Sequence, residues 1–88
     1  MKLRLVFAEQ GWEDTCFWIS TDRKVAKRLI RLIDDCRKNP FDGIGKPEAL
    51  KESYSGYWSR RITDEHRLVY KVTDDELWIA QARYHYKK

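Results

Sequence analysis

The sequence of 88 residues is poor in the residue types that are typical of disulfide-rich, metal-binding or secreted proteins. Its two cysteines, Cys16 and Cys36, are far apart and have no histidine nearby, which argues against a disulfide framework and a zinc site. We expect both thiols to be buried and reduced. No apolar run approaches the roughly 18 residues of a membrane span, and residues 1–7 are too short and too alternating for a signal peptide. A cytoplasmic protein without a membrane segment is therefore predicted.

Proline and glycine are also scarce, at two and four residues, and there is no repeat or low-complexity segment. The hydrophobic content of 42% and the four tryptophans are typical of a folded globule. A chain of this length buries roughly 60–70% of its unfolded surface, which is sufficient for one core but not for two. We therefore expect a single domain over residues 1–88.

The hydrophobic pattern of the N-terminal part predicts a strand and then a helix. Alternating apolar residues predict a short first strand that carries Leu3, Leu5 and Phe7. The helical spacing of Trp12, Cys16 and Ile19 predicts a first helix over residues 9–19. We expect Trp12 and Trp18 to pack this helix on a sheet.

Residues 20–38 predict a second helix. Ser20, Thr21 and Asp22 are candidate caps, and Asn39 should end the helix because the residue before a proline avoids the helical region. Its apolar stripe is expected at Val25, Leu29, Leu32, Ile33 and Cys36. The opposite face carries the cations Lys24, Lys27, Arg28 and Arg31.

The second half predicts a loop followed by three strands. Residues 41–55 are irregular, and Pro47 is expected to open one helical turn over residues 47–51. Strands are predicted at residues 57–63, 66–73 and 77–86. Connections this short join antiparallel neighbours. The expected fold class is therefore α+β, with a mostly antiparallel sheet and two helices packed on one face.

The net charge of +4 is unevenly distributed along the chain. Residues 20–38 carry +4 and residues 46–88 carry +2, whereas residues 1–19 and 39–45 carry −1 each. A protein that approaches a polyanion with one face has this kind of distribution. A solvated helix with surplus lysine is the alternative interpretation.

Three kinds of side chain in the second half fit the cleavage of RNA without a metal. Glu48, between Lys46 and Lys51, is the candidate general base, and His85 is the candidate general acid because imidazole titrates near neutrality. Arg67 is the candidate phosphate ligand, because a guanidinium group forms two parallel hydrogen bonds to phosphate oxygens. RNA supplies its own nucleophile, the 2′-hydroxyl, so no metal or cofactor is expected.

Strand parity constrains the other candidates. Arg60 and Arg61 point to opposite faces, so at most one of them joins the site. His85 and Tyr86 also alternate, so the last strand must twist or end if both are to reach one phosphate. Tyr86 is expected to orient the phosphate or stack a base, and His66 is interpreted as structural. Further candidate contacts to RNA phosphates are Lys46, Lys51 and Arg61.

The runs GKPEALK, GYWSRRITDEHRLVYKVTDD and ARYHY, in this order, resemble the YoeB/Txe toxins of the RelE-like superfamily. The segment TDRKVAKRLIRLIDDCRKNPFDG matches in pattern, so the likeness covers essentially the whole chain and is more specific than one short motif. The resemblance implies the RelE-like fold and a toxin of a bacterial type II toxin–antitoxin system that cuts messenger RNA in the ribosomal A site. It also implies a labile antitoxin partner of the YefM type, contacts with mRNA and the 70S ribosome, and a homodimer, which is frequent in this branch.

The implied reaction is attack of the 2′-hydroxyl on the neighbouring phosphate, which leaves a 2′,3′-cyclic phosphate and a 5′-hydroxyl. The resemblance supports catalytic roles for Glu48, Arg67, His85 and Tyr86, and it makes ribosomal RNA the expected partner of the basic helix face. Two alternatives stay open. One is a toxin of the same fold that blocks a partner without catalysis, and the other is a plain RNA- or ribosome-binding module.

Overall fold

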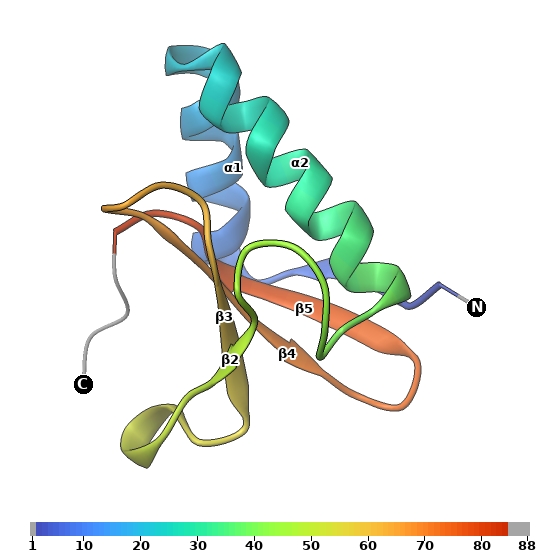
Figure 1. Cartoon of the computed structure of the whole chain (residues 1–88). Coiled ribbons are helices and arrows are strands. Elements are labelled where there is room, and N and C mark those ends of the chain that lie inside the picture. Colours follow the sequence, from blue (N-terminus) through green and yellow to red (C-terminus); the bar gives the residue numbers. More distant parts are fainter. Residues whose placement is uncertain (1, 85–88) are drawn as a thin grey trace.

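Two helices lie across one face of a sheet in this computed structural model, which describes residues 2–84 (Figure 1). Within this range the sheet has five strands in the order β1-β5-β4-β3-β2, and all neighbours are antiparallel except β1 and β5. The predicted α+β fold is confirmed. In chain order the elements are β1 (Arg4–Phe7), α1 (Glu9–Thr21), α2 (Arg23–Lys38), β2 (Glu48–Ala49), the 3-10 helix η1 (Glu52–Tyr54), β3 (Tyr57–Arg61), β4 (Arg67–Val72) and β5 (Glu76–Gln81).

Helix α2 forms as its sequence predicts. Asp22 caps it, since the carboxylate accepts a hydrogen bond from the Val25 N–H at 3.2 Å. The helix ends at Lys38, two residues before Pro40. The predicted stripe packs on the core, with Val25 partly buried and the other four residues buried. Each fully buried aliphatic side chain of this size contributes about 1.5–3 kcal/mol.

Helix α1 buries a different face from the predicted one. Trp12 and Ile19 are 54% and 60% exposed, whereas the buried residues of the helix are Gly11, Asp14, Thr15 and Trp18. Gly11 lies against β5, where a Cβ atom would be only 2.2 Å from the Ile79 carbonyl oxygen. Close approach to the sheet and a hydrogen bond to it place Gly11 and Asp14 on this face, and Trp18 buries its ring in the core beside them. Trp18 therefore packs on the sheet as predicted. Trp12 is more than half exposed, but its ring lies edge-on to Phe7 of β1, with centroids 5.4 Å apart, so the prediction for Trp12 is met in part.

Strand β5 ends at Gln81, whereas the sequence predicted a strand over residues 77–86. The Ala82 N–H donates to Asp14 Oδ2 at 2.9 Å, and the Ala82 carbonyl accepts from Trp18 Nε1 at 2.8 Å. Both backbone polar groups of Ala82 are thus bonded to side chains of α1 instead of to a neighbouring strand. The predicted strand extended further, to residues 85 and 86, which lie outside the described residues.

The predicted helical turn over residues 47–51 was wrong. Residues 48 and 49 form strand β2 instead, antiparallel to β3, and the Leu50 N–H donates to the Tyr57 carbonyl at 2.9 Å. A single helical turn is unfavourable on its own, because nucleation orders several residues for one hydrogen bond. Pairing with β3 satisfies backbone groups of residues 48–50 by hydrogen bonds to a strand that is already ordered.

The two cysteines, Cys16 and Cys36, differ in burial. Both thiols are free. Cys36 is buried, and burial raises its pKa to about 11, whereas Cys16 is only half-buried. The expectation of two buried thiols is therefore correct for one of them.

No helix within residues 2–84 has both the length and the apolar character that crossing a membrane requires.

Candidate functional site

The sheet face that the helices leave uncovered, here called the open face, collects candidate residues from three strands. Leu68 and Tyr70 belong to the core under the helices. Arg67 therefore points to the open face, because side chains alternate along a strand. Cross-strand pairing extends the same face to Arg61 on β3 and to Glu48 on β2. The register behind this assignment consists of the pairs Arg61–Arg67, Ser59–Val69 and Glu48–Ser59.

Glu48 and Arg67 are two strands and two residues apart in this register, which corresponds to a Cα separation of about 12 Å. Side chains of their length can reach opposite sides of one phosphate group across that gap. Glu48 is exposed, and within residues 2–84 its carboxylate makes no hydrogen bond or ion pair. Of its two expected lysine neighbours, Lys46 lies on the Arg61 side and Lys51 lies beyond the other end of β2.

Arg67 is fixed to the turn between β3 and β4 by one of its terminal nitrogens. Nη1 donates to the carbonyls of Thr63 at 2.7 Å, Asp64 at 3.1 Å and His66 at 3.1 Å. Among residues 2–84, Nε and Nη2 have no hydrogen-bond partner, so this edge of the guanidinium group can still donate two parallel bonds to a phosphate. The turn therefore orients the group, and no residue within 2–84 occupies its Nε–Nη2 edge.

Arg28 connects the basic face of α2 to the end of β3. Its Nη2 donates to the Arg61 carbonyl at 3.3 Å. The exposed Arg61 guanidinium lies 4.0 Å from the Asp64 carboxylate. The other predicted cations of this helix face are exposed, namely Lys24, Lys27 and Arg31. The basic helix face and the open face therefore meet at Arg61.

A buried set of hydrogen bonds fixes the loop that leads to Glu48. Arg60 Nη1 donates to Asp35 Oδ2 at 2.6 Å and to the Ile44 carbonyl at 3.1 Å. Arg60 Nε donates to the Tyr70 hydroxyl at 3.2 Å, and Nη2 donates to two further loop carbonyls. We call this group the Arg60 cluster: Arg60, Asp35, Tyr70 and the backbone of residues 39–44. The prediction that Arg60 and Arg61 face opposite sides is confirmed.

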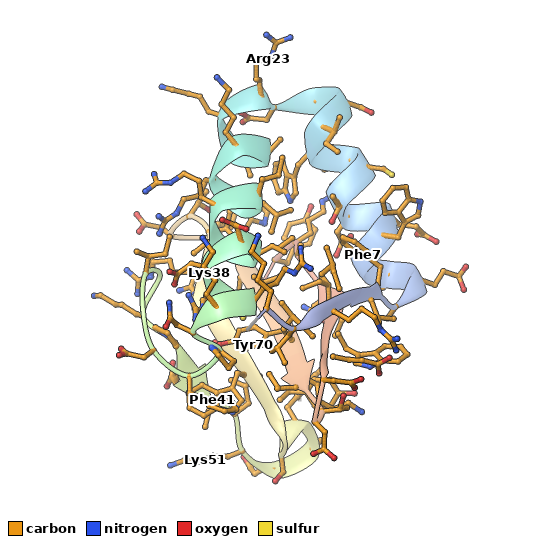
Figure 2. All side chains as sticks on the ribbon, turned by 90° about the vertical axis from the view of Figure 1, so that its right-hand side faces the viewer. Phe7, Arg23, Lys38, Phe41, Lys51 and Tyr70 are labelled. Atoms are coloured by element: carbon orange, nitrogen blue, oxygen red, sulfur yellow. The ribbon has the colours of Figure 1, made fainter. Side chains whose placement is uncertain are left out.

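The Arg60 cluster is charged at its centre. The hydrogen bond from Arg60 holds the pKa of Asp35 below its usual range, and burial raises the pKa of Tyr70 above its usual range. Tyr70 is therefore neutral near pH 7, and its hydroxyl donates to the Pro40 carbonyl at 2.7 Å. Figure 2 shows Tyr70 below the end of α2, close to Phe41 of the loop. The cluster thus joins α2, two strands and the loop before β2.

The chain after β5 returns to the candidate site at Arg67. The Arg67 N–H donates to the Tyr84 carbonyl at 3.0 Å, and residues 82–84 lie alongside the turn between β3 and β4 (Figure 1). The residue that precedes His85 therefore lies beside the candidate phosphate ligand. His85 and Tyr86 themselves lie outside the described residues, and their roles stay predictions.

Two features of this site were missed from the sequence. Nothing in the strand pattern distinguished Arg60 as the buried partner of Asp35, although an acid beside the apolar stripe of α2 was a usable signal. His66 was interpreted as structural, and the hydrogen bond that its Nδ1 accepts from the Tyr84 N–H at 2.7 Å joins residues that are distant in sequence. Both features depend on contacts between segments that are far apart in the sequence.

Taken together, the open face offers a carboxylate that has no partner among residues 2–84, two guanidinium groups and an adjoining basic helix face. Such a surface can bind a phosphate group and accept a proton from a neighbouring hydroxyl. Among the residues that the structure describes, no group of three or more His, Cys, Asp or Glu side chains could hold a metal ion. These features define a small cationic protein suited to a polyanionic ligand.

Comparison with known proteins gives a consistent result. The family model described as YoeB-like toxin of bacterial type II toxin-antitoxin system matches residues 7–86. Toxin YoeB of Streptomyces coelicolor is 62% identical over 84 residues, which cover 96% of this chain and 100% of the relative. The YoeB/ParE toxin from Agrobacterium tumefaciens has a TM-score of 0.90 at 43% identity, with 96% of this chain and 100% of that chain covered.

Structures from Staphylococcus aureus add two assemblies. A YoeB dimer has a TM-score of 0.89 at 42% identity, and a heterotetrameric complex of YoeB-YefM toxin-antitoxin has a TM-score of 0.87 at 42% identity. Each covers 98% of this chain and 100% of the compared chain. The chain therefore belongs to the YoeB-like toxin family, and it is a toxin of a type II toxin–antitoxin system. The resemblance inferred from its sequence runs is confirmed.

Proposed function

We propose that this chain is an endoribonuclease that cleaves messenger RNA in the A site of the ribosome without a metal. The observation that supports it most is the shared open face of Glu48, Arg61 and Arg67, with the Tyr84 backbone bonded to Arg67 immediately before His85. One domain over residues 1–88 carries the whole activity.

The reaction needs one proton acceptor, one proton donor and a ligand for the phosphate. Glu48 takes the proton of the 2′-hydroxyl, the 2′-oxygen attacks phosphorus, and the bond from phosphorus to the 5′-oxygen breaks as His85 protonates that oxygen. The products are a 2′,3′-cyclic phosphate and a 5′-hydroxyl. Each positioned acid or base contributes roughly 10²–10⁴-fold to the rate.

The remaining candidates stabilise and orient the phosphate. The Nε–Nη2 edge of Arg67 donates to two phosphate oxygens, and a preorganised donor of this kind is worth about 3–4 kcal/mol in the transition state. Tyr86 orients the phosphate or stacks a base. Arg61, Lys46 and Lys51 add positive charge along the RNA backbone.

The partners follow from the charge and from the relatives. The basic face of α2 contacts ribosomal RNA through Lys24, Lys27, Arg28 and Arg31, and such contacts weaken steeply with salt. An antitoxin of the YefM type binds and silences the toxin, and the chain forms a homodimer, as the solved dimer and complex of its relatives suggest. The protein acts in the cytoplasm, where ribosomes are.

Glu48→Ala and His85→Ala should each lower the cleavage rate at least about 100-fold. The measurement maps the 5′ ends of messenger on programmed ribosomes and follows single-turnover cleavage. Thermal unfolding and antitoxin binding should stay unchanged in both variants. Glu13→Ala is the matched control, since it removes an exposed acid of α1 and should cleave at the wild-type rate.

The outcomes separate the competing functions. Cleavage at the wild-type rate by the Glu48→Ala, His85→Ala double variant would refute the mechanism. Equal inhibition of translation by the wild type and by His85→Ala, with no new 5′ ends, would favour a ribosome-binding module. Toxicity of the double variant without any effect on ribosomes would favour a toxin of the same fold that blocks another partner.

A further inference from the structure

The last described residues, 82–84, are attached to the rest of the fold by side chains from two directions. Asp14 and Trp18 of α1 bind the two backbone groups of Ala82 at 2.9 and 2.8 Å. The Arg83 guanidinium lies over the Phe17 ring, 3.6 Å from its centroid. Contacts of α1 therefore fix where the chain leaves the sheet.

Tyr84 is held from the other side, by the start of β4. Its φ of +60° lies in the left-handed region, which is unfavourable for a residue with a side chain. Its N–H donates to His66 Nδ1 at 2.7 Å, and its carbonyl accepts from the Arg67 N–H at 3.0 Å. Two consecutive residues thus bind both polar groups of a strained residue, and such strain persists only where its surroundings hold it.

The hydrogen bond from Tyr84 also indicates the tautomer of His66. A backbone N–H can only donate, so Nδ1 is unprotonated and the ring proton is on Nε2. The Nε2 atom lies 3.8 Å from Glu65 Oε1, which favours that tautomer. The ring packs edge-on against Trp18, with centroids 4.7 Å apart, and lies 5.1 Å from the Tyr84 ring. His66 is therefore a rigid acceptor that points at one backbone N–H.

We propose that His66 is a positioning residue of the RNA cleavage site, acting through the hydrogen bond that Nδ1 accepts from the Tyr84 N–H. This bond fixes Tyr84, the residue that precedes His85. The carbonyl of Tyr84 is at the same time bonded to the backbone N–H of Arg67. His66 touches neither RNA nor the reacting atoms in this role. The inference rests on the proposed function, and its structural part can be tested separately.

Two substitutions separate the acceptor from the ring. His66→Asn places an amide oxygen close to the position of Nδ1 and loses the ring, whereas His66→Phe keeps a ring against Trp18 and loses the acceptor. Hydrogen exchange at the Tyr84 amide reports the bond directly. Single-turnover cleavage on programmed ribosomes reports its consequence, with the maximal rate and the half-saturating toxin concentration measured separately.

We expect His66→Phe to speed exchange of the Tyr84 amide at least 10-fold and to lower the maximal cleavage rate roughly 10- to 100-fold, the cost of a misplaced catalytic group. Ribosome binding should change less than about threefold, because the basic surfaces are intact. His66→Asn should keep both exchange and rate within about threefold of the wild type. Should His66→Phe fail to fold, His66→Leu carries the same prediction.

Each other result overturns the inference. Wild-type exchange in His66→Phe means that the bond is not what holds Tyr84. Faster exchange with an unchanged rate means that holding Tyr84 does not matter for cleavage. Loss of activity in His66→Asn with retention in His66→Phe means that the ring, not the acceptor, is needed. If the wild type cleaves nothing, the proposed function and the positioning role both fail, and exchange still decides whether the bond exists.

Discussion

Replacing Asp35 by asparagine should separate the charge of the Arg60 cluster from its hydrogen bonds. Asp35 Oδ2 accepts from both Arg60 Nη1 and the Ile44 N–H. An asparagine amide oxygen can occupy that position and keep both bonds. What disappears is the negative charge opposite a guanidinium group with no exposed surface.

The expected loss of stability follows from the burial of this pair. The Arg60 side chain is 0% exposed and that of Asp35 is 26% exposed. Removing one partner of a buried pair costs about 3–5 kcal/mol, and the retained hydrogen bonds reduce this, so we expect Asp35→Asn to lose about 2–4 kcal/mol at pH 7. A domain of this size has about 5–15 kcal/mol in total, so the variant should still fold.

Helix α2 supplies a matched control at the preceding position. Asp34 is 51% exposed and pairs on the surface with Lys2 and Lys38. Exposed pairs contribute about 0–1 kcal/mol, so Asp34→Asn should change stability by less than about 1 kcal/mol. Urea denaturation followed by tryptophan fluorescence measures both variants, and the Asp35→Asn midpoint should fall by about 1 M or more.

The stability difference between the wild type and Asp35→Asn should also depend on pH in a definite direction. The pKa of Asp35 is lowered in the folded state by the Arg60 hydrogen bond, so its contribution is present above the unfolded value of about 3.9 and is lost as the pH falls through the lower folded value. The difference between wild type and Asp35→Asn should therefore be full at pH 7 and shrink below about pH 4. Equal losses in the two asparagine variants, or a difference that does not shrink in acid, would refute the reasoning.

Two further predictions concern α1 and the thiols. Gly11→Ala should destabilise the protein by about 1–3 kcal/mol, because the new Cβ atom would meet a β5 carbonyl oxygen at 2.2 Å, and thermal unfolding that matches the wild type would contradict this close approach. Alkylation at pH 8 should modify the half-buried Cys16 first and Cys36 only after unfolding, since burial raises the pKa of Cys36 to about 11. Peptide mass analysis measures both rates, and comparable rates in the folded protein would contradict the burial of Cys36.

Helix α2 and the three C-terminal strands could be predicted because their signals are local. The apolar stripe of α2 repeats at helical spacing, Asp22 supplies a cap, and Pro40 limits the end. The turns between β3, β4 and β5 are too short for anything except antiparallel pairing. The order of the elements then determines which face of the sheet the helices cover.

Helix α1 was predicted at the right place in the chain, but its buried face could not be predicted in the same way. Its apolar residues Trp12 and Ile19 are more than half exposed, whereas Gly11 and Asp14 are buried. These two are buried because β5 passes close to them and because Ala82 needs a partner for its N–H. Such reasons involve a segment that is distant in sequence, so no periodicity within the helix contains them.

The candidate site, too, could be predicted from the sequence only in part. The residue types of Glu48, Arg67 and His85 are enough to indicate phosphate chemistry, because carboxylate, guanidinium and imidazole each do one job in that reaction. The strand register and the long-range bonds of Arg60 and His66 decided which of the described groups share a face and what holds them.

By itself, then, the sequence determined the elements with local patterns, the charge of the protein and the chemistry of its side chains. Only the tertiary structure decided the buried face of α1, the strand at β2 and the attachment of the chain end at Tyr84. The physical reason is that local spacing encodes propensity and polarity. The pairing of buried polar groups depends on which distant segments meet.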